Sequence, residues 1–461
     1  MSLTVGVGAI AACAAVLVYR ERVGELFQRD TGALSLVMKL GQLGAGARAT
    51  SRNYSNFESG NIGRSVKVAS DTWTLQLRND NDDALPLSWR QWFYFRIDDL
   101  PVNQKVSLTL SGLGMPAYFL PFYSLDNIDW IQFPKEAVTR PTATSMQIVS
   151  QFPSQKIWFA RYVPYHYTRL TNYLSKVSGH PSVTLRDIGR SPGGLPIPIL
   201  TITDSASIAP KQRVILHART HPGEVGGSYV IEGLVNYLLS DEPLAKSLRE
   251  RLIFTIIPMV NVDGVVAGNN RTTPDGVNLE GKWISGRDLD LDHQHVPSEI
   301  LLLNRAFRAL LATGVPVSMA LNLHSSAGEP TDLVFAFPHF GTAERGYTAA
   351  ESQLFEKQIK FISLLAEQYG TDMLASPPSD GGRAFVNKKL PESWWWRHFQ
   401  DRVMALTLES TYGFAGRTGH WMKPRDLRRL GESLAVAIIR YHETTVAKSV
   451  TNGHKSMEIR R

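Results

Sequence analysis

Hydrophobic and polar positions alternate differently in the two halves of the chain. Between residues 56 and 165, short apolar stretches such as "WTLQLRND" and "QWFYFRID" are separated by polar turn sequences such as "NDNDD" and "DDLP". Apolar stretches of this length with turn residues between them predict β-strands. We therefore expect residues 56–165 to form an all-β sandwich domain.

From residue 166 onward, apolar strands alternate with amphipathic helices. "RVILHA", "RLIFTIIPMV" and "VSMALNLHS" are continuous apolar runs, and "SYVIEGLVNYLL" has the apolar spacing of a helix. Continuous apolar strands between helices are typical of a sheet that is buried on both faces. We predict an α/β domain over residues 166–445, with a mostly parallel or mixed central β-sheet flanked by helices. The polar, basic tail at residues 446–461 is expected to be disordered.

The first 55 residues contain an apolar N-terminal segment and a linker. Residues 3–19 include no charged side chain, and Arg-Glu-Arg follows at residues 20–22. This length is near the lower limit for a helix that spans a membrane. A membrane anchor, a cleaved signal and a merely buried segment are the alternatives. If the segment spans a membrane, the positive charges after it place the body of the protein in the cytoplasm.

Charge and cysteine content narrow the classes of partner. The chain has 461 residues and a formal net charge of +7, and its length allows roughly two domains. A positive protein favours an acidic partner, but no basic run is interleaved with aromatic residues as in a nucleic-acid binder. From the charge we expect an anionic partner, either a substrate or a membrane surface, and no nucleic acid. Cys13 is the single cysteine, which excludes an intrachain disulfide and agrees with a reducing compartment.

Three side chains that commonly bind metals follow predicted strands. His221 and Glu224 come after "RVILHA", and His324 comes after "VSMALNL". Open α/β sheets place their sites at the ends of strands, and two histidines with one glutamate form a known ligand set for catalytic zinc. On its own, His-x-x-Glu is common by chance and favours a polar loop that caps the next helix over a metal site. The added histidine favours one zinc ion per chain.

Two further residues have the chemistry that metal-assisted amide hydrolysis requires. Such a reaction needs a general base beside the attacking water and a cation beside the developing oxyanion. Glu409 ends the apolar strand "ALTLE", where a carboxylate has little use in packing. Arg271 follows the Asn-x-Asp-Gly turn in "NVDGVVAGNNR"; a lone arginine after a turn is usually a solvated residue.

In this order and spacing, "ARTHPGE", "PMVNVDGVVAGNNR", "LNLHS" and "LTLEST" resemble the motifs of the zinc metallocarboxypeptidases, or funnelin superfamily. The chain is most similar to their cytosolic carboxypeptidase-like subfamily. "FESGNIGR", "QWFYFRI" and "IWFARYVPYHYTRL" resemble segments of the β-sandwich domain that precedes the catalytic domain in that subfamily. The resemblance covers residues 56–440.

The resemblance implies roles for the residues that match these motifs. His221, Glu224 and His324 would bind zinc, Glu409 would be the general base, and Arg271 would stabilise the oxyanion. It also implies a central mixed sheet of about eight strands. The activity implied is hydrolysis of a peptide or isopeptide amide bond by metal-activated water.

The chain departs from the superfamily where an Asn-Arg pair usually binds the C-terminal carboxylate of the substrate. In "GVNLEGKWISGRDLDL", one alignment puts Glu280 and Gly281 at the pair, and another puts Asp290 and Leu291 there. Both alignments lose the arginine and introduce an acid. An acid repels a carboxylate, and the loss of a bidentate arginine removes its main anchor.

Several interpretations of this departure are open. Another cation, Arg287 or Lys282, could hold the carboxylate, with Asn270 as a further substrate-binding candidate. Alternatively, the protein is an amidase or deacylase that acts on substrates without a free C-terminal carboxylate. A third alternative is a non-catalytic pseudo-peptidase. Three tryptophans at residues 394–396 either pack beneath the site or form an aromatic wall for the substrate.

Overall fold

The structure is a computed structural model that describes residues 54–458, apart from gaps at 81–83, 116–118, 327–333, 371–372, 374–382 and 416–418. The apolar segment at residues 3–19, for which we considered a membrane anchor, lies outside the described residues. Among the helices that the structure does describe, none combines the length and apolar character needed to cross a membrane.

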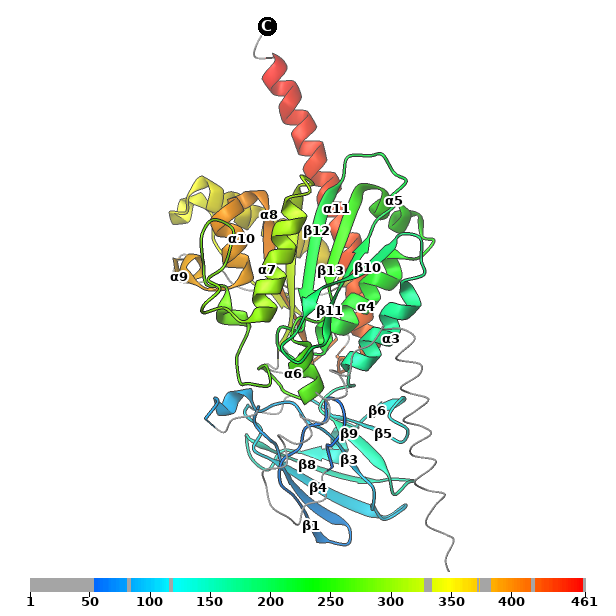
Figure 1. Ribbon diagram of the computed structural model, residues 1–461. Coiled ribbons are helices and arrows are strands. Elements are labelled where there is room, and N and C mark those ends of the chain that lie inside the picture. The colour runs from blue at the N-terminus through cyan, green and yellow to red at the C-terminus, as the bar shows by residue number, and fades with distance from the viewer. Residues whose placement is uncertain are drawn as a thin grey trace, which may run out of the picture.

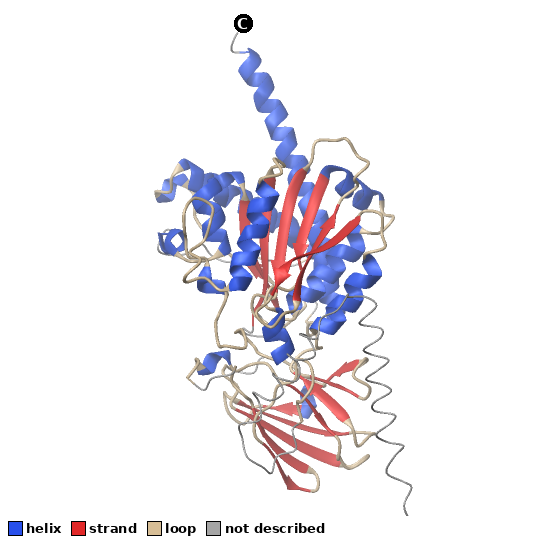
Figure 2. Ribbon diagram, in the orientation of Figure 1, coloured by secondary structure: helices blue, strands red, loops and turns tan. Residues whose placement is uncertain are grey.

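The N-terminal part of the described chain is mostly strands, as predicted, and forms two sheets (Figure 2). In order across the sheet, the five-stranded sheet contains β1 (Ser65–Ala69), β2 (Thr72–Gln76), β4 (Lys105–Ser111), β8 (Ser145–Gln151) and β7 (Val138–Thr139). The four-stranded sheet contains β3 (Tyr94–Ile97), β9 (Ile157–Ala160), β5 (Phe122–Ser124) and β6 (Trp130–Gln132). Alternate residues of β4 are buried, because successive side chains of a strand point to opposite faces.

The C-terminal part contains a central mixed sheet, which confirms the predicted fold class. Within the described residues it has seven strands, which in order across the sheet are β10 (Val183–Arg190), β11 (Pro196–Ile202), β13 (Leu252–Ile257), β12 (Gln212–Ala218), β14 (Val317–Ser326), β16 (Met404–Thr411) and β15 (Phe335–Ala336). The resemblance implied about eight strands for such a sheet. Strands β13, β12, β14 and β16 are parallel, and the outer strands are antiparallel.

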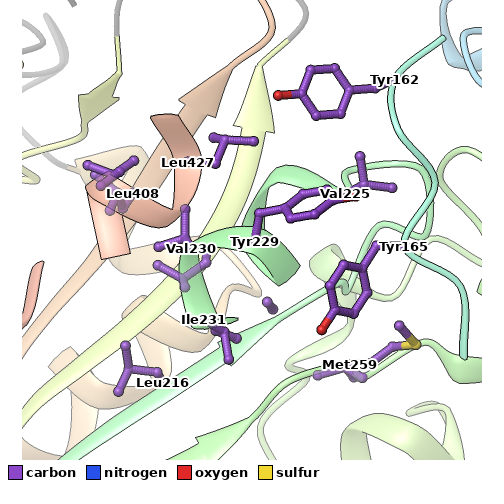
Figure 3. Close-up of a cluster of buried hydrophobic side chains, with 14 of the residues drawn as sticks. Tyr162, Tyr165, Leu216, Val225, Tyr229, Val230, Ile231, Met259, Leu408 and Leu427 are labelled. Carbon is purple, nitrogen blue, oxygen red and sulfur yellow. The ribbon is translucent and has the colours of Figure 1, made fainter. Parts of the chain in front are cut away.

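Helices cover both faces of this sheet (Figure 1). The helices of the described chain are α3 (Tyr167–Val177), α4 (Gly226–Leu238), α5 (Pro243–Arg251), α6 (Val262–Ala267), α7 (Ser298–Leu311), α8 (Ala349–Tyr369), α9 (Arg383–Asn387), α10 (Pro391–Phe399) and α11 (Pro424–Glu458). Short 3-10 helices are η2 (Leu87–Trp89), η3 (Lys135–Ala137), η4 (Glu280–Lys282), η5 (Ala343–Arg345) and η6 (Gln400–Arg402). Leu216 of β12 packs in the core on the side of α4 (Figure 3), whereas the next residue, His217, contacts Phe307 of α7.

One predicted segment differs from the structure. We expected a disordered tail from residue 446, but α11 continues to Glu458. The tail sequence contains no proline, and an existing helix extends at little cost once it is nucleated. The domain boundaries at residues 55/56 and 165/166 stay predictions; the two N-terminal sheets span Ser65–Ala160, and the mixed sheet spans Val183–Thr411.

The parallel strands bring four chain segments to one edge of the mixed sheet. The carboxyl ends of parallel strands meet at the same edge, where open α/β sheets place their sites. Helix α6, which follows β13, lies at the junction with the N-terminal sheets (Figure 1). The edge that carries the predicted site residues therefore faces the N-terminal domain.

Candidate metal centre

A buried arginine shapes the loop after β12. Arg219 is 2% exposed and has a left-handed backbone, with φ 61°. Its Nε donates to the carbonyl oxygen of Pro222 at 2.9 Å, and its Nη1 donates to Tyr165 O at 2.9 Å and to Ser228 Oγ at 2.8 Å. These bonds tie the loop to the first turn of α4, so both predicted ligands of the loop are held against the sheet edge.

His221, Glu224 and His324 converge at this edge. Glu224 Oε1 lies 2.8 Å from His221 Nδ1, and Glu224 Oε2 lies 2.8 Å from His324 Nδ1. One possible ligand atom from each residue lies within 4.8 Å of the other two. Burial alone would raise the pKa of Glu224, but the two histidines hold it well below its usual value. A charged carboxylate with two imidazole nitrogens is a donor set that fits a zinc ion.

The other ring nitrogen of each histidine has its own partner. His221 Nε2 lies 3.1 Å from Asn278 Oδ1, and His324 Nε2 lies 3.2 Å from Glu280 Oε2. Such partners fix the tautomer and ring orientation of histidines that bind metal. Sequence reasoning missed Asn278. The sequence signal that could have indicated Asn278 is its spacing from Glu280. Two residues separated by one position can each contact one of two neighbouring histidine rings.

Glu409 lies directly beside one of the histidines. It is the register partner of His324 on the adjacent parallel strands β16 and β14. The pKa of Glu409 is raised to about 8. Burial is the largest cause; the charge of His324 lowers the pKa, and the neighbouring Glu224 raises it. A carboxylate with a pKa near neutrality is suited to accept and return a proton.

Arg271 also approaches this group of residues. It lies close enough to Glu409 to lower the pKa of that carboxyl. Its guanidinium lies over the ring of Trp89, 5.5 Å from the ring centre. Asn270 is 8% exposed, and its carbonyl oxygen accepts from Gly223 N at 2.8 Å, so its backbone borders the loop that carries His221 and Glu224.

Glu280 and Asp290, the two acids that the alternative alignments put at the Asn-Arg pair, lie in different surroundings. Glu280 is at the site: its Oε2 contacts His324, and its Oε1 accepts from Asn322 Nδ2 at 2.9 Å. Asp290 forms an ion pair with Arg308 at 2.7 Å. Arg287 is exposed, and in the part of the chain that the structure describes we see no ion pair from it to the metal centre. Its role in substrate binding stays a prediction.

The three consecutive tryptophans are buried. Trp394 and Trp395 are 0% and 1% exposed, and Trp396 is 9% exposed. Trp394 packs on Trp283 and Phe307, with ring centres 5.9 Å and 6.3 Å apart. These contacts favour the packing interpretation over an aromatic wall that faces the substrate.

A chain of buried polar groups leads away from the metal centre. Asn322 contacts Glu280 on one side and interacts with Glu392 of α10 on the other. Glu392 is 2% exposed and accepts from Thr407 Oγ1 at 2.8 Å. Burial and the charge of Glu280 raise the pKa of Glu392 to about 7. The support of the site therefore includes two buried carboxyls that share one asparagine.

Two family models match the chain. One is described as "Zinc carboxypeptidase" and covers residues 170–325, and the other is described as "Cytosolic carboxypeptidase N-terminal domain" and covers residues 54–162. The first match includes His221, Glu224, Arg271 and His324 and ends before Glu409. The assignment of Glu409 therefore depends on its place beside His324.

Curated relatives include cytosolic carboxypeptidase 2 from Mus musculus, which is 32% identical over 271 residues, 52% of this chain and 30% of that protein. Cytosolic carboxypeptidase 3 from Bos taurus is 31% identical over 261 residues, 50% of this chain and 25% of that protein. The match thus spans less than a third of either relative.

Solved structures share the fold. A metallo-carboxypeptidase from Burkholderia cenocepacia superposes with a TM-score of 0.70 at 24% identity, over 85% of this chain and 98% of that chain. A metallo-carboxypeptidase from Pseudomonas aeruginosa has a TM-score of 0.67 at 22% identity, over 83% of this chain and 97% of that chain. At these identities the likeness establishes the common architecture.

Proposed function

This chain contains a zinc carboxypeptidase domain preceded by the N-terminal domain of the cytosolic carboxypeptidases, and from this premise we propose that it hydrolyses a peptide or isopeptide amide bond. The observation that carries the proposal is the convergence of His221, Glu224 and His324, with Glu409 in register beside His324. Two histidines and one glutamate are the protein ligands of several zinc hydrolases.

Each residue of the site has a distinct task. Zinc, when bound, supplies a Lewis acid that polarises the scissile carbonyl and acidifies the attacking water. His221, Glu224 and His324 hold the metal. Glu409 accepts the proton of the attacking water and returns it to the leaving nitrogen. Arg271 places a positive charge where the oxyanion develops.

The substrate is less well defined than the reaction. Glu280 has both oxygens engaged by Asn322 and His324, and Gly281 has no side chain with which to bind a carboxylate. This observation favours, as a second candidate, an amidase or deacylase whose substrate lacks a free C-terminal carboxylate. If the substrate does carry that carboxylate, we propose Arg287 and Asn270 as the residues that would bind it.

Two supporting arguments bear on partners and location. The net charge of +7 is consistent with an acidic peptide or protein substrate, and we propose no nucleic-acid partner. The relatives are named cytosolic carboxypeptidases, which supports a cytoplasmic location for this chain.

The test is the variant Glu409→Gln in zinc-loaded full-length protein. The substrates are a panel of peptides that end in Glu, Lys or Phe, each as the free acid and as the C-terminal amide. We expect wild type to hydrolyse at least one peptide, and the variant to bind zinc normally but to lose about 10²–10⁴ in kcat. Equal rates would contradict the mechanism.

The paired substrates separate the two candidate functions. A strict need for the free acid eliminates the amidase or deacylase. Hydrolysis of the amides at a similar or higher rate favours it. A wild-type protein that retains zinc and hydrolyses none of the panel would point to the pseudo-peptidase.

A further inference from the structure

One buried carboxylate of the N-terminal domain holds the backbone on which Arg271 lies. Asp80 follows β2 and is 1% exposed. Its Oδ1 accepts from the backbone N of Asn270 at 2.7 Å, and its Oδ2 accepts from those of Arg271 at 2.7 Å and Thr272 at 2.9 Å. A fourth bond, at 3.2 Å, comes from Thr272 Oγ1. Three successive amides of the catalytic domain thus converge on one side chain of the other domain.

The N-terminal domain also contacts helix α6, which immediately precedes this segment. Asn61 Nδ2 donates to Gly268 O at 2.7 Å, Ser59 Oγ donates to Val265 O at 2.7 Å, and Arg78 Nη2 donates to Ala267 O at 3.1 Å. The last carbonyls of a helix have no partner within the helix. Here side chains of the other domain satisfy several of them, so the end of α6 is part of the domain interface.

The side chain of Arg271 is placed by the same domain. Trp89 of η2 lies against its guanidinium, and the Arg271 Nε is buried without a hydrogen-bond partner among the described residues. A cation over an indole ring gains electrostatic attraction. Backbone and side chain of Arg271 are therefore both restrained by residues that the N-terminal domain supplies.

We propose that Asp80 is a positioning residue for the hydrolysis: it fixes the Asn270–Thr272 backbone so that Arg271 points toward Glu409 and the metal ligands. The N-terminal domain is then part of the catalytic apparatus and does more than stabilise the fold. The inference rests on the proposed function for its kinetic consequence, whereas the hydrogen bonds can be tested without it. A carboxylate suits this task because both of its oxygens accept, and bonds to a charged acceptor are about twice as strong as neutral ones.

The first measurement is independent of activity. In Asp80→Asn, one oxygen becomes an amide group that faces backbone N–H donors. We expect hydrogen exchange of the 268–273 segment to accelerate at least tenfold in full-length, zinc-loaded protein, while helix α8, which forms no hydrogen bond with this segment, keeps its exchange rate. The matched control is Asp99→Asn, which removes an exposed ion pair with Lys67 in the same domain. Unchanged exchange of residues 268–273 would overturn the proposal, whether or not the protein is active.

The second measurement is a double-mutant cycle on the peptide that wild type cleaves fastest. Misplacement of a catalytic group by about 1 Å can cost about 10²-fold in rate, so Asp80→Asn should lower kcat by about 10–100-fold with KM and zinc content little changed. After Arg271→Ala, the Asp80→Asn change should cost nothing more, because the two residues act as one unit. Additive losses would show that Asp80 does not act through Arg271.

Trp89→Leu can replace Asp80→Asn in the double-mutant cycle with Arg271→Ala if Asp80→Asn fails to fold. Trp89 is half-buried, and its loss removes the ring beneath the guanidinium but no interdomain hydrogen bond. We expect a smaller loss of kcat that again vanishes in the Arg271→Ala background. If wild type retains zinc and cleaves nothing, the proposed function fails, and the exchange experiment still decides whether Asp80 holds the segment.

Discussion

At the scale of single residues, the replacement of the expected Asn-Arg pair has a structural explanation. Glu280 is directed toward the ring of His324, and its second oxygen is bonded to Asn322. Burial alone would raise the pKa of Glu280, but His324 and the other nearby histidines lower it to about 2. A charged carboxylate behind a metal-binding histidine orients the ring and increases its basicity. We infer that Glu280 supports the metal ligands.

We therefore predict that Glu280→Gln weakens zinc binding. The neutral amide can still contact His324, but it removes the negative charge behind the ring. Zinc affinity, measured by competition with a chromogenic chelator, should fall by about 10–100-fold. Glu356→Gln is the control because this residue of α8 is exposed and is not among the metal-binding candidates. An unchanged affinity would contradict the role assigned to Glu280.

A second prediction concerns Glu392, which faces Glu280 across Asn322 and bonds to Thr407. Because burial raises its pKa from 4.5 to about 7, the folded state holds a proton that the unfolded chain releases. Its contribution to stability is complete below pH 4.5 and is lost as the pH rises toward 7. Glu392→Gln mimics the protonated form. Between pH 4.5 and pH 7, the free energy of unfolding of the variant should therefore rise relative to that of wild type by on the order of 3 kcal/mol.

Chemical denaturation of metal-free protein at pH 5, 6 and 7.5 would measure this difference. Glu250→Gln, a change at an exposed residue of α5, provides the control and should parallel wild type. If the free energies of unfolding of Glu392→Gln and wild type differ by the same amount at all three pH values, Glu392 does not titrate in this range.

At the scale of elements, the close contact between α4 and α11 supports the loop that carries two metal ligands. Gly233 of α4 and Gly431 of α11 lie at the contact, and a Cβ on either would overlap a backbone carbonyl of the other helix. Helix α4 begins at Gly226, directly after the loop that contains His221 and Glu224. The absence of side chains at two positions therefore sets the position of this helix against the sheet.

Gly431→Ala should destabilise the protein. Its Cβ would meet Val230 O, so the helices must separate, which typically costs about 1–3 kcal/mol. The urea midpoint at constant m-value reports the change. Gly179→Ala is the matched control because a Cβ there meets nothing within 4 Å, and it should alter stability by less than about 0.5 kcal/mol. Equal midpoints for the two variants would contradict the close packing.

At the scale of the whole molecule, the two domains share an extensive buried interface. Tyr162 and Tyr165, in the connection between the domains, pack against Tyr229 of α4, with ring centres 6.3 Å and 5.1 Å apart (Figure 3). Tyr162 Oη donates to Met422 O at 3.2 Å. Together with the bonds from Asp80 and Asn61, these contacts connect the N-terminal sheets to the core that supports the metal centre.

We predict that the domains unfold together. Zinc at about 100 times its dissociation constant stabilises the folded state by about 2.7 kcal/mol, and cooperative unfolding transmits that gain to the N-terminal domain. Hydrogen exchange of β4 should then slow on zinc addition as much as exchange of β12. A β4 exchange rate that zinc leaves unchanged, or two separate calorimetric transitions, would contradict this coupling.

The sequence by itself identified which side chains could form the candidate metal centre. Apolar runs identified the strands, and His221, Glu224, His324 and Glu409 lie at their ends, so parallel pairing was sufficient to bring them to one edge. These inferences need only local patterns, because a strand and the residue that follows it are adjacent in the chain.

Only the tertiary structure decided how the centre is supported. Glu280 and Asp290 were equivalent in the sequence, and the direction of a side chain selected Glu280 as the partner of His324. Asp80 and Arg271 are 191 residues apart, and no periodicity relates them. Contacts of this kind depend on where the two domains pack, which is why the role of the N-terminal domain was not predictable from the sequence.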